Sequence, residues 1–319
     1  MRNYISEAAY EQEMQARVMP VLDAARRAGT FKGYDQNLLR FVRYDATAPK
    51  GTVLMLHGLN ESTEKYREMI YYFLCAGLSV MIFDQRGHGR SHRTVKQGLV
   101  HVKHFDEYVK DALCAIKGPL ATCPPPYFLF GHSMGGAVAT LLLEQTGQPF
   151  ERAVLSSPMI RTFRYPHIPP ALVGFACRAL SAIGFAKRGV SARKKHAGEE
   201  DFANSCALSR ARFDAYAALK RQQPEYAGGT ITFGWTREAI GVTKRILAKG
   251  APERIAIPVR IYSAGRDHLV ESAEQRELAA RIPKGELVSI PDAKHEIYMS
   301  SDDILHPYLD GVLQFLCGQ

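Results

Sequence analysis

The sequence predicts an α/β fold with a mostly parallel central sheet, and three observations support this prediction. Short apolar runs rich in β-branched and aromatic residues recur along the chain, each closed by a turn signal. The later runs are almost wholly apolar, as expected for strands that are buried on both faces. Stretches with helical patterns lie between the runs, and alternating strands and helices build parallel sheets through right-handed crossovers.

The individual elements follow from these patterns. The predicted strands are residues 38–44, 52–56, 79–83, 127–130, 153–155, 259–262 and 287–290, and the predicted helices are residues 65–75, 105–117, 136–145 and 273–280. The interval from 158 to 247 has no convincing core strand. We interpret it as a mostly helical insertion over the carboxyl edge of the sheet, where open α/β sheets bind ligands. The expected domains are a core of residues 1–157 and 248–319 and a cap, or lid, of residues 158–247.

The composition is that of an ordinary globular protein and excludes collagen, low-complexity disorder and small disulfide scaffolds. The 319 residues are 46% hydrophobic and 23% charged, which predicts one large domain, or one domain with an insertion. The net charge of +9 comes from one segment, because residues 152–197 contain nine basic and no acidic residues. These nine are Arg152, Arg161, Arg164, Arg178, Lys187, Arg188, Arg193, Lys194 and Lys195.

The N-terminal sequence and the cysteines predict a cytoplasmic protein. Residues 1–18 contain three glutamates and no continuous apolar run, so we expect no secretory signal. No stretch reaches the roughly 18–20 apolar residues of a membrane span. The six cysteines have no C-x-x-C pair and no metal-ligand spacing, which is typical of free thiols in a reducing compartment. We therefore expect no metal and no other cofactor.

A glycine-rich motif between a predicted strand and a predicted helix points to a nucleophile. Residues 131–136 are Gly-His-Ser-Met-Gly-Gly. In the G-x-S-x-G pattern a sharp strand-to-helix turn exposes the serine, and glycines flank it because a Cβ would collide with the neighbouring strand and helix. The alternative is an ordinary glycine-rich loop. The sequence context favours Ser133 as the nucleophile.

A serine nucleophile needs a base and an orienting acid, which follow it in the order acid, then histidine, in this architecture. Asp267 and His295 come directly after two late predicted strands. Because these strands end at the same edge of the sheet as Ser133, the three side chains are expected to meet. The competing candidates are His268 and His306 for the base and Asp292 for the acid.

Such a site also needs backbone donors for the developing oxyanion, each worth about 3–4 kcal/mol of transition-state stabilisation. One donor is expected from the residue after the nucleophile, Met134. The other is expected from the loop after the strand 52–56, where the N–H of Leu59 is the best candidate. A simple strand-terminating turn at this loop is the plainer interpretation, and it is compatible with the functional one.

The loop of residues 84–91 is rich in glycine and arginine and therefore resembles a phosphate-binding loop. It lacks the spacing of both G-x-x-x-x-G-K-[ST] and G-x-G-x-x-G. The sequence favours a structural loop beside the site over an anion site.

A helix predicted over residues 169–185 begins with prolines and places apolar residues on one face. These residues are Leu172, Phe175, Ala176, Ala179 and Ile183. The favoured interpretation is a face that packs on the rest of the cap. The alternative is an acyl-chain wall or a membrane-surface helix, whose basic neighbours would contact anionic headgroups. Nucleic-acid binding is not expected, because no recognition motif accompanies the basic residues.

Together, these motifs resemble the α/β-hydrolase superfamily and, more narrowly, its branch of monoacylglycerol lipases and bacterial lysophospholipases, the serine-aminopeptidase-like hydrolases. The resemblance covers residues 36–316 and rests on His57-Gly58-x-x-Glu61 with Tyr66, Asp84-x-Arg86-Gly87-x-Gly89-x-Ser91, Gly131–Gly136, and a cap segment at 204–240 with Arg212-Phe213 and Phe233-Gly234-Trp235. It implies an α/β-hydrolase fold with a helical cap and no cofactor. It also implies a triad of Ser133, Asp267 and His295, with Leu59 and Met134 as oxyanion donors.

The expected function is a serine ester hydrolase that releases a fatty acid from a lysophospholipid or monoacylglycerol through an acyl-enzyme on Ser133. The alternatives are a generic carboxylesterase, then a peptidase and a non-catalytic ligand-binding protein. A peptidase needs carboxylates to bind a free amino terminus, and the first forty residues of the cap have none. The expected partners are a lipid or ester substrate and an anionic membrane surface. Headgroup, acyl length and oligomeric state are left open.

Overall fold

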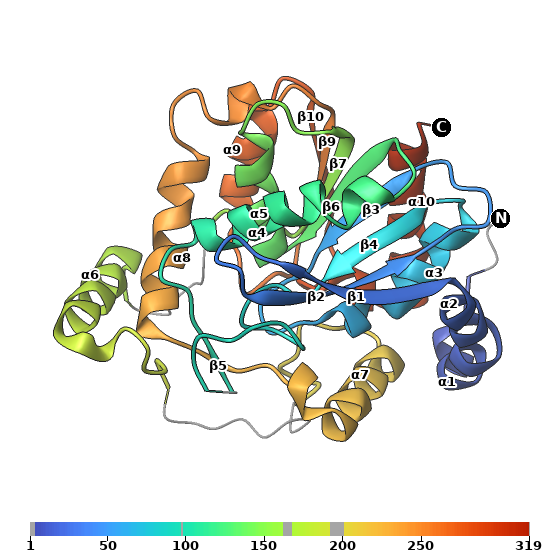
Figure 1. Ribbon diagram of the computed structural model, residues 1–319, viewed down its shortest axis with the longest axis horizontal. Helices are drawn as coiled ribbons and strands as arrows, with labels where there is room; N and C mark the ends of the chain where they lie inside the picture. Colours follow the sequence, from blue (N-terminus) through green and yellow to red (C-terminus); the bar gives the residue numbers. More distant parts are fainter. Residues whose placement is uncertain (1–3, 97, 162–167, 192–200, 319) are drawn as a thin grey trace.

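The computed structural model describes residues 4–96, 98–161, 168–191 and 201–318, and its centre is an eight-stranded sheet (Figure 1). The strand order is β1-β2-β4-β3-β6-β7-β9-β10. The strands are β1 (Arg26–Lys32), β2 (Leu38–Tyr44), β3 (Thr52–Leu56), β4 (Ser79–Phe83), β6 (Tyr127–His132), β7 (Phe150–Ser156), β9 (Val259–Ala264) and β10 (Gly285–Ile290). All pairs from β4 to β10 are parallel, whereas β2 is antiparallel to both β1 and β4. The predicted α/β fold is confirmed.

Helices pack on both faces of this sheet and create two hydrophobic cores. The helices are α1 (Tyr10–Glu13), α2 (Met19–Ala25), α3 (Arg67–Cys75), α4 (Asp106–Lys117), α5 (Met134–Leu143), α6 (Pro170–Leu180), α7 (Arg210–Gln222), α8 (Phe233–Ile246), α9 (Ser272–Arg281) and α10 (Asp302–Cys317). Leu54 and Leu56 of β3 belong to the core with α4, α5, α8 and α9, while Val53 and Met55 belong to the core with α3 and α10. Successive strand residues point to opposite faces, so a wholly apolar strand supplies both cores.

The N-terminal segment, which the sequence pattern did not place, packs on the core. Ile5, Val18 and Leu22 are buried in the core formed with α3 and α10. The edge strand β1 follows and pairs along its whole length with β2. Its sequence mixes arginine, glycine and lysine with few apolar residues, and all seven of its residues are partly or fully exposed. An edge strand with this composition has no hydrophobic alternation that could reveal it.

The region between β7 and β9 contains α6, α7, α8 and the two-residue strand β8 (Thr230–Ile231). Strand β8 pairs in parallel with β5 (Leu99–Val100), which comes from the loop after β4. These two strands form a small separate sheet at the periphery (Figure 1). The elements fit a helical insertion, and the division into a core and a cap of residues 158–247 stays a prediction.

The apolar face predicted on α6 does not pack on the rest of the cap. Leu172, Phe175 and Ile183 are exposed by 55%, 73% and 69%, and Ala176 and Ala179 are exposed as well. The helix instead packs on α8 through its opposite side, where Gly174 and Cys177 are buried. Small residues on this side allow the two helices to approach closely, and the favoured interpretation of the apolar face was therefore wrong. No helix in the described part of the chain is long and apolar enough to cross a membrane.

Candidate active site

The predicted nucleophile occupies a strained turn between β6 and α5. Ser133 has a positive φ of 50° and a ψ of −117°, an unusual conformation for a residue with a side chain. A Cβ on Gly135 would lie 2.1 Å from the backbone oxygen of Leu56, and one on Gly131 would lie 2.8 Å from the backbone oxygen of Gly135. The turn therefore requires glycine at both positions, as the collision argument from the sequence predicts.

The structure brings Ser133, His295 and Asp267 into one hydrogen-bonded chain. His295 Nε2 lies 2.8 Å from Ser133 Oγ, and His295 Nδ1 lies 2.6 Å from Asp267 Oδ2. The other oxygen, Asp267 Oδ1, accepts hydrogen bonds from the N–H groups of Leu269 and Val270 at 2.8 and 3.1 Å. Since a carboxylate only accepts, Nδ1 carries the proton and Nε2 is free to accept the serine proton.

Burial and charge act in opposite directions on this pair. Burial lowers the pKa of His295, but the carboxylate of Asp267 and its hydrogen bond outweigh burial and raise that pKa above its ordinary value. Burial raises the pKa of Asp267, but His295 and the two backbone N–H groups hold it below its ordinary value. The acid is therefore ionised at neutral pH and favours protonation of the histidine.

The competing candidates lie elsewhere. His268 and Asp292 are exposed, and His306 stacks on the ring of Tyr4 with 4.5 Å between ring centroids. Among the residues weighed from the sequence, only Ser133, Asp267 and His295 meet.

The loop that carries Leu59 is held on both sides. The N–H of Gly58 donates to Glu61 Oε2 at 2.6 Å, and Asn60, which has a positive φ of 60°, accepts from the N–H of Gly229 at 2.8 Å. Met134, the other predicted oxyanion donor, is the first residue of α5 and is fully buried. Its N–H belongs to the helix N-terminus, where the macrodipole favours negative charge.

Glu61 is the centre of a buried polar cluster beside His295. Besides Gly58, its carboxylate accepts from Tyr66 Oη at 2.6 Å, from Lys65 Nζ at 3.0 Å and from Tyr298 Oη. Burial raises the pKa of Glu61, but Lys65 and these donors hold it well below its ordinary value. A buried carboxylate with four donors is fully satisfied and rigid.

The same cluster extends to the histidine loop and to the turn with the serine. Lys65 Nζ also lies 2.5 Å from the carboxylate of Glu296, the residue after His295. His132, the residue before Ser133, lies 3.7 Å from Glu61 through Nε2, and burial lowers its pKa to about 3. The cluster therefore links three loops that carry the predicted oxyanion donor, nucleophile and base.

Sequence reasoning assigned no role to Lys65, Glu296 or Tyr298. The spacing of Glu61 and Lys65, four residues apart, indicates an ion pair on a helical turn. The positions of Glu296 and Tyr298, one and three residues after His295, are the other available signal. Their meeting with Glu61 depends on how distant loops pack, and a single sequence does not reveal it.

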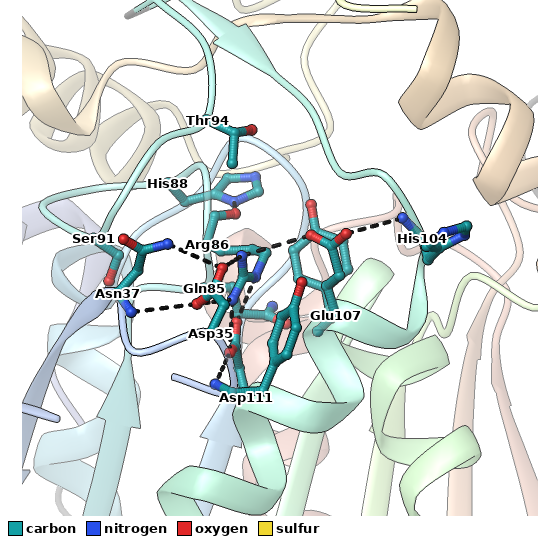
Figure 2. Close-up of polar contacts among 12 residues, drawn as sticks. Asp35, Asn37, Gln85, Arg86, His88, Ser91, Thr94, His104, Glu107 and Asp111 are labelled. Carbon is teal, nitrogen blue, oxygen red and sulfur yellow. Dashed lines mark hydrogen bonds and ion pairs between the residues drawn. The ribbon is translucent and has the colours of Figure 1, made fainter. Parts of the chain in front are cut away.

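The arginine at the centre of the loop of residues 84–91 is paired with carboxylates of the protein itself. Arg86 is buried and makes two hydrogen bonds with Asp111, at 2.6 and 2.8 Å, and two with Asp35, at 3.0 and 3.2 Å. Figure 2 shows Asp35, Asp111 and Glu107 around this guanidinium. Because internal carboxylates neutralise Arg86, its charge is not available to a ligand, which favours the structural interpretation over an anion site.

Comparison with known proteins gives a family match and relatives that are named as lipid hydrolases. The serine aminopeptidase S33 family matches residues 47–302. A probable lysophospholipase L2 of Haemophilus influenzae is 28% identical over 271 residues, 85% of each chain. A monoacylglycerol lipase of Mycolicibacterium smegmatis is 27% identical over 277 residues, 85% of this chain and 89% of the relative.

Solved structures agree in fold. The crystal structure of a thermostable carboxyl esterase from Bacillus coagulans has a TM-score of 0.73 at 20% identity, and the match covers 92% of this chain and 98% of that one. At this identity the likeness speaks for the fold alone. The family match spans most of the sequence and confirms the resemblance seen in the motifs. The chain therefore belongs to the serine aminopeptidase S33 family of hydrolases and has the α/β-hydrolase fold.

Proposed function

We propose that the protein is a serine ester hydrolase that releases a fatty acid from a single-acyl lipid, a lysophospholipid or a monoacylglycerol. The hydrogen-bonded chain from Ser133 through His295 to Asp267 carries this proposal. The relatives described as a probable lysophospholipase and a monoacylglycerol lipase support the lipid class.

The proposed reaction follows the geometry. His295 Nε2 takes the proton of Ser133 Oγ while this oxygen attacks the ester carbonyl carbon. The N–H groups of Leu59 and Met134 stabilise the oxyanion of the tetrahedral intermediate. His295 then gives its proton to the alcohol oxygen, the ester bond breaks, and the acyl group stays on Ser133. A water molecule, deprotonated by His295, attacks the acyl carbon. The bond from this carbon to Ser133 Oγ then breaks, His295 returns the proton to Oγ, and the fatty acid is released.

The substrate class is tested by comparing rates. Hydrolysis of a lysophosphatidylcholine, a monoacylglycerol, a butyryl aryl ester and an amino-acid amide is measured with the full chain. We expect the highest kcat/KM for a long-chain lipid, and an alkyl fluorophosphonate, which reacts with activated serines, is expected to label Ser133. A preference for two- to four-carbon acyl groups would contradict the lipid class and keep the esterase mechanism. Labelling of another serine would contradict the mechanism itself.

We also propose that α6 and the segment after it contact an anionic lipid surface. The exposed side chains of Leu172, Phe175 and Ile183 form an apolar face, and the exposed Lys187 and Arg188 follow it in the chain. An apolar face flanked by cations is typical of interfacial helices. Of the other basic residues expected at this surface, Arg161 pairs with Glu274 at 2.9 Å. Arg164, Arg193, Lys194 and Lys195 lie outside the described residues.

Vesicle sedimentation tests this contact. The double substitution Phe175→Ser with Ile183→Ser is expected to weaken binding to phosphatidylglycerol vesicles about tenfold or more, because two large apolar side chains lose their burial in the lipid interface. Binding is also expected to fall in 1 M salt, which shortens the Debye length to about 3 Å. The matched control is Val21→Ser with Leu38→Ser, two apolar residues exposed elsewhere. Equal binding of both double variants would contradict the proposal.

A further inference from the structure

A pocket with three cations lies at the edge of the molecule between the loop after β4 and the segment after α6. Its volume is about 460 Å³. Its lining consists of Arg93, Thr94, Val95, Lys96, Leu99 and Lys187. None of these six residues is acidic, so the pocket combines three cationic side chains with a mostly apolar lining.

The positive charge of this pocket is poorly compensated within the described part of the chain. Neither Lys96 nor Lys187 has a carboxylate within ion-pair distance among the described residues. Two carboxylates on neighbouring elements pair with cations outside the pocket: Glu225 with Arg90 at 2.7 Å and Glu238 with Arg237 at 2.9 Å.

Arg93 is half-buried, and backbone carbonyls hold its guanidinium. It donates to the backbone oxygens of Gly87, Gly89 and Glu225, the last two at 3.1 and 3.2 Å. Burial, only partly offset by the charge of Asp84, lowers its pKa. A cation held in this way keeps its position without a carboxylate partner.

The backbone around Lys187 is also ordered by hydrogen bonds. The carbonyl oxygen of Ala186 accepts from the N–H of Gly234 at 2.8 Å, and that of Arg188 accepts from the N–H of Phe233 at 3.0 Å. Lys187 is close enough to His101 that its charge, after burial, helps to hold the pKa of that imidazole below its ordinary value. Hydrogen bonds therefore hold the backbone beside Lys187 and the guanidinium of Arg93, and the cations of the lining come from two parts of the chain.

A short path connects the pocket to the loop of the predicted oxyanion donor. A Cβ on Gly229 would lie 2.6 Å from the carbonyl of Gly98, the residue before Leu99 in the pocket wall. On its other side, Gly229 donates its N–H to Asn60, the residue after Leu59. One glycine segment thus separates the pocket from the loop of the predicted active site.

We propose that this pocket, which we name the phosphate pocket, binds the phosphate group of a lipid headgroup. Several lysine and arginine donors with no acid among them match the acceptor oxygens and the negative charge of a phosphate. The volume exceeds the needs of a phosphate ion and leaves room for the alcohol esterified to it. Phosphate binding stands independently of the proposed function, whereas a lysophospholipid substrate as the source of the phosphate rests on it.

Calorimetric titration of the full chain with glycerol 3-phosphate and with inorganic phosphate tests the binding. The double variant Lys96→Gln with Lys187→Gln is expected to lose about tenfold or more of the affinity of the wild type, since two charge-assisted contacts disappear. The matched control, Lys249→Gln with Lys284→Gln, removes two exposed lysines outside the pocket and should bind as the wild type does. Equal affinity of the two double variants, or no binding to the wild type, would overturn the proposal.

Kinetics with two substrates of the same acyl chain identify the source of the phosphate. If the lysophospholipid supplies it, the double variant Lys96→Gln with Lys187→Gln has a raised KM for lysophosphatidylcholine and an unchanged KM for the monoacylglycerol. If a free phosphate compound supplies it, both KM values stay unchanged while the calorimetric affinity falls. If no lipid is hydrolysed, the proposed function fails, and the calorimetric result still decides the pocket.

Discussion

Replacing Asp267 with Asn is expected to lower kcat for ester hydrolysis by about 10⁴-fold. The amide cannot stabilise the imidazolium that forms when His295 takes the proton of Ser133. It also offers an N–H group at a position where the histidine Nδ1–H needs an acceptor, so the tautomer with a free Nε2 is no longer favoured. Ser133→Ala, which removes the attacking oxygen, is expected to lower kcat by about 10⁶-fold and gives the limit of the assay.

The pH dependence of the same variant separates this role from simple damage to the fold. Catalysis requires a neutral His295, so activity is lost as the pH falls through the pKa of His295. In the wild type, Asp267 raises that pKa, and the acid limb of kcat/KM should have its midpoint above the ordinary pKa of a histidine. In Asp267→Asn the carboxylate no longer opposes burial, and the midpoint should move to lower pH.

The matched control is Asp292→Asn. Asp292 is exposed and is the other residue that the sequence offers as the acid of the triad. It is expected to keep the kcat and the acid limb of the wild type. Thermal unfolding of both variants verifies that each is folded. A large loss of kcat in Asp292→Asn, or an unchanged acid limb in Asp267→Asn, would contradict the assignment of the acid.

The sequence predicts the sheet well because buried strands leave a local pattern, and the same pattern places the residues of the predicted triad at strand ends. The predicted strands 38–44, 52–56 and 79–83 coincide with β2, β3 and β4, since continuous apolar runs between turns are the signature of buried strands. The predicted strand 153–155 is shorter than β7, because Glu151 and Arg152 interrupt the apolar run. Ser133, Asp267 and His295 each follow a strand, and the ends of parallel strands meet at one edge.

Other features depend on long-range packing and carry no local signal. The orientation of α6 is decided by how closely Gly174 and Cys177 allow α8 to approach, and hydrophobic periodicity favoured the other face. The cluster around Glu61 likewise forms only when the histidine loop packs on the loop after β3. The partners of a buried charge come from distant parts of the chain, as the environment of Arg212 illustrates.

Arg212 of α7 is a fully buried cation that joins four segments of the chain. Its guanidinium makes two hydrogen bonds with Glu68 of α3, at 2.8 and 2.9 Å, and one with Asp302 at the start of α10, at 2.8 Å. It also donates to the backbone oxygen of Ser300 at 3.0 Å and lies 3.7 Å from the carboxylate of Glu7. Its side chain has 0% exposure and that of Glu68 has 9%, so water screens this pair little.

Replacing Arg212 with Met is expected to lower the free energy of unfolding by about 3–5 kcal/mol. Methionine fills much of the same volume, so the loss comes chiefly from the carboxylate of Glu68, which stays buried without its cation. Urea unfolding of the full chain measures the change. The matched control is Arg210→Met, because Arg210 is 68% exposed and pairs with Asp214 on the surface of the same helix, where an ion pair contributes about 0.5 kcal/mol or less.

A second substitution identifies the uncompensated charge as the cause. In the double variant Arg212→Met with Glu68→Gln the buried carboxylate is gone, and the amide oxygen can still accept from Tyr72 Oη, which lies 3.0 Å from Glu68. The double variant is therefore expected to be more stable than Arg212→Met alone by about 1 kcal/mol or more, although it lacks one more native side chain. If Glu68→Gln instead lowers the free energy of unfolding further, the unpaired carboxylate is not the cause of the loss. In that case α7 is held on the core by the packing and hydrogen bonds of Arg212 rather than by its charge.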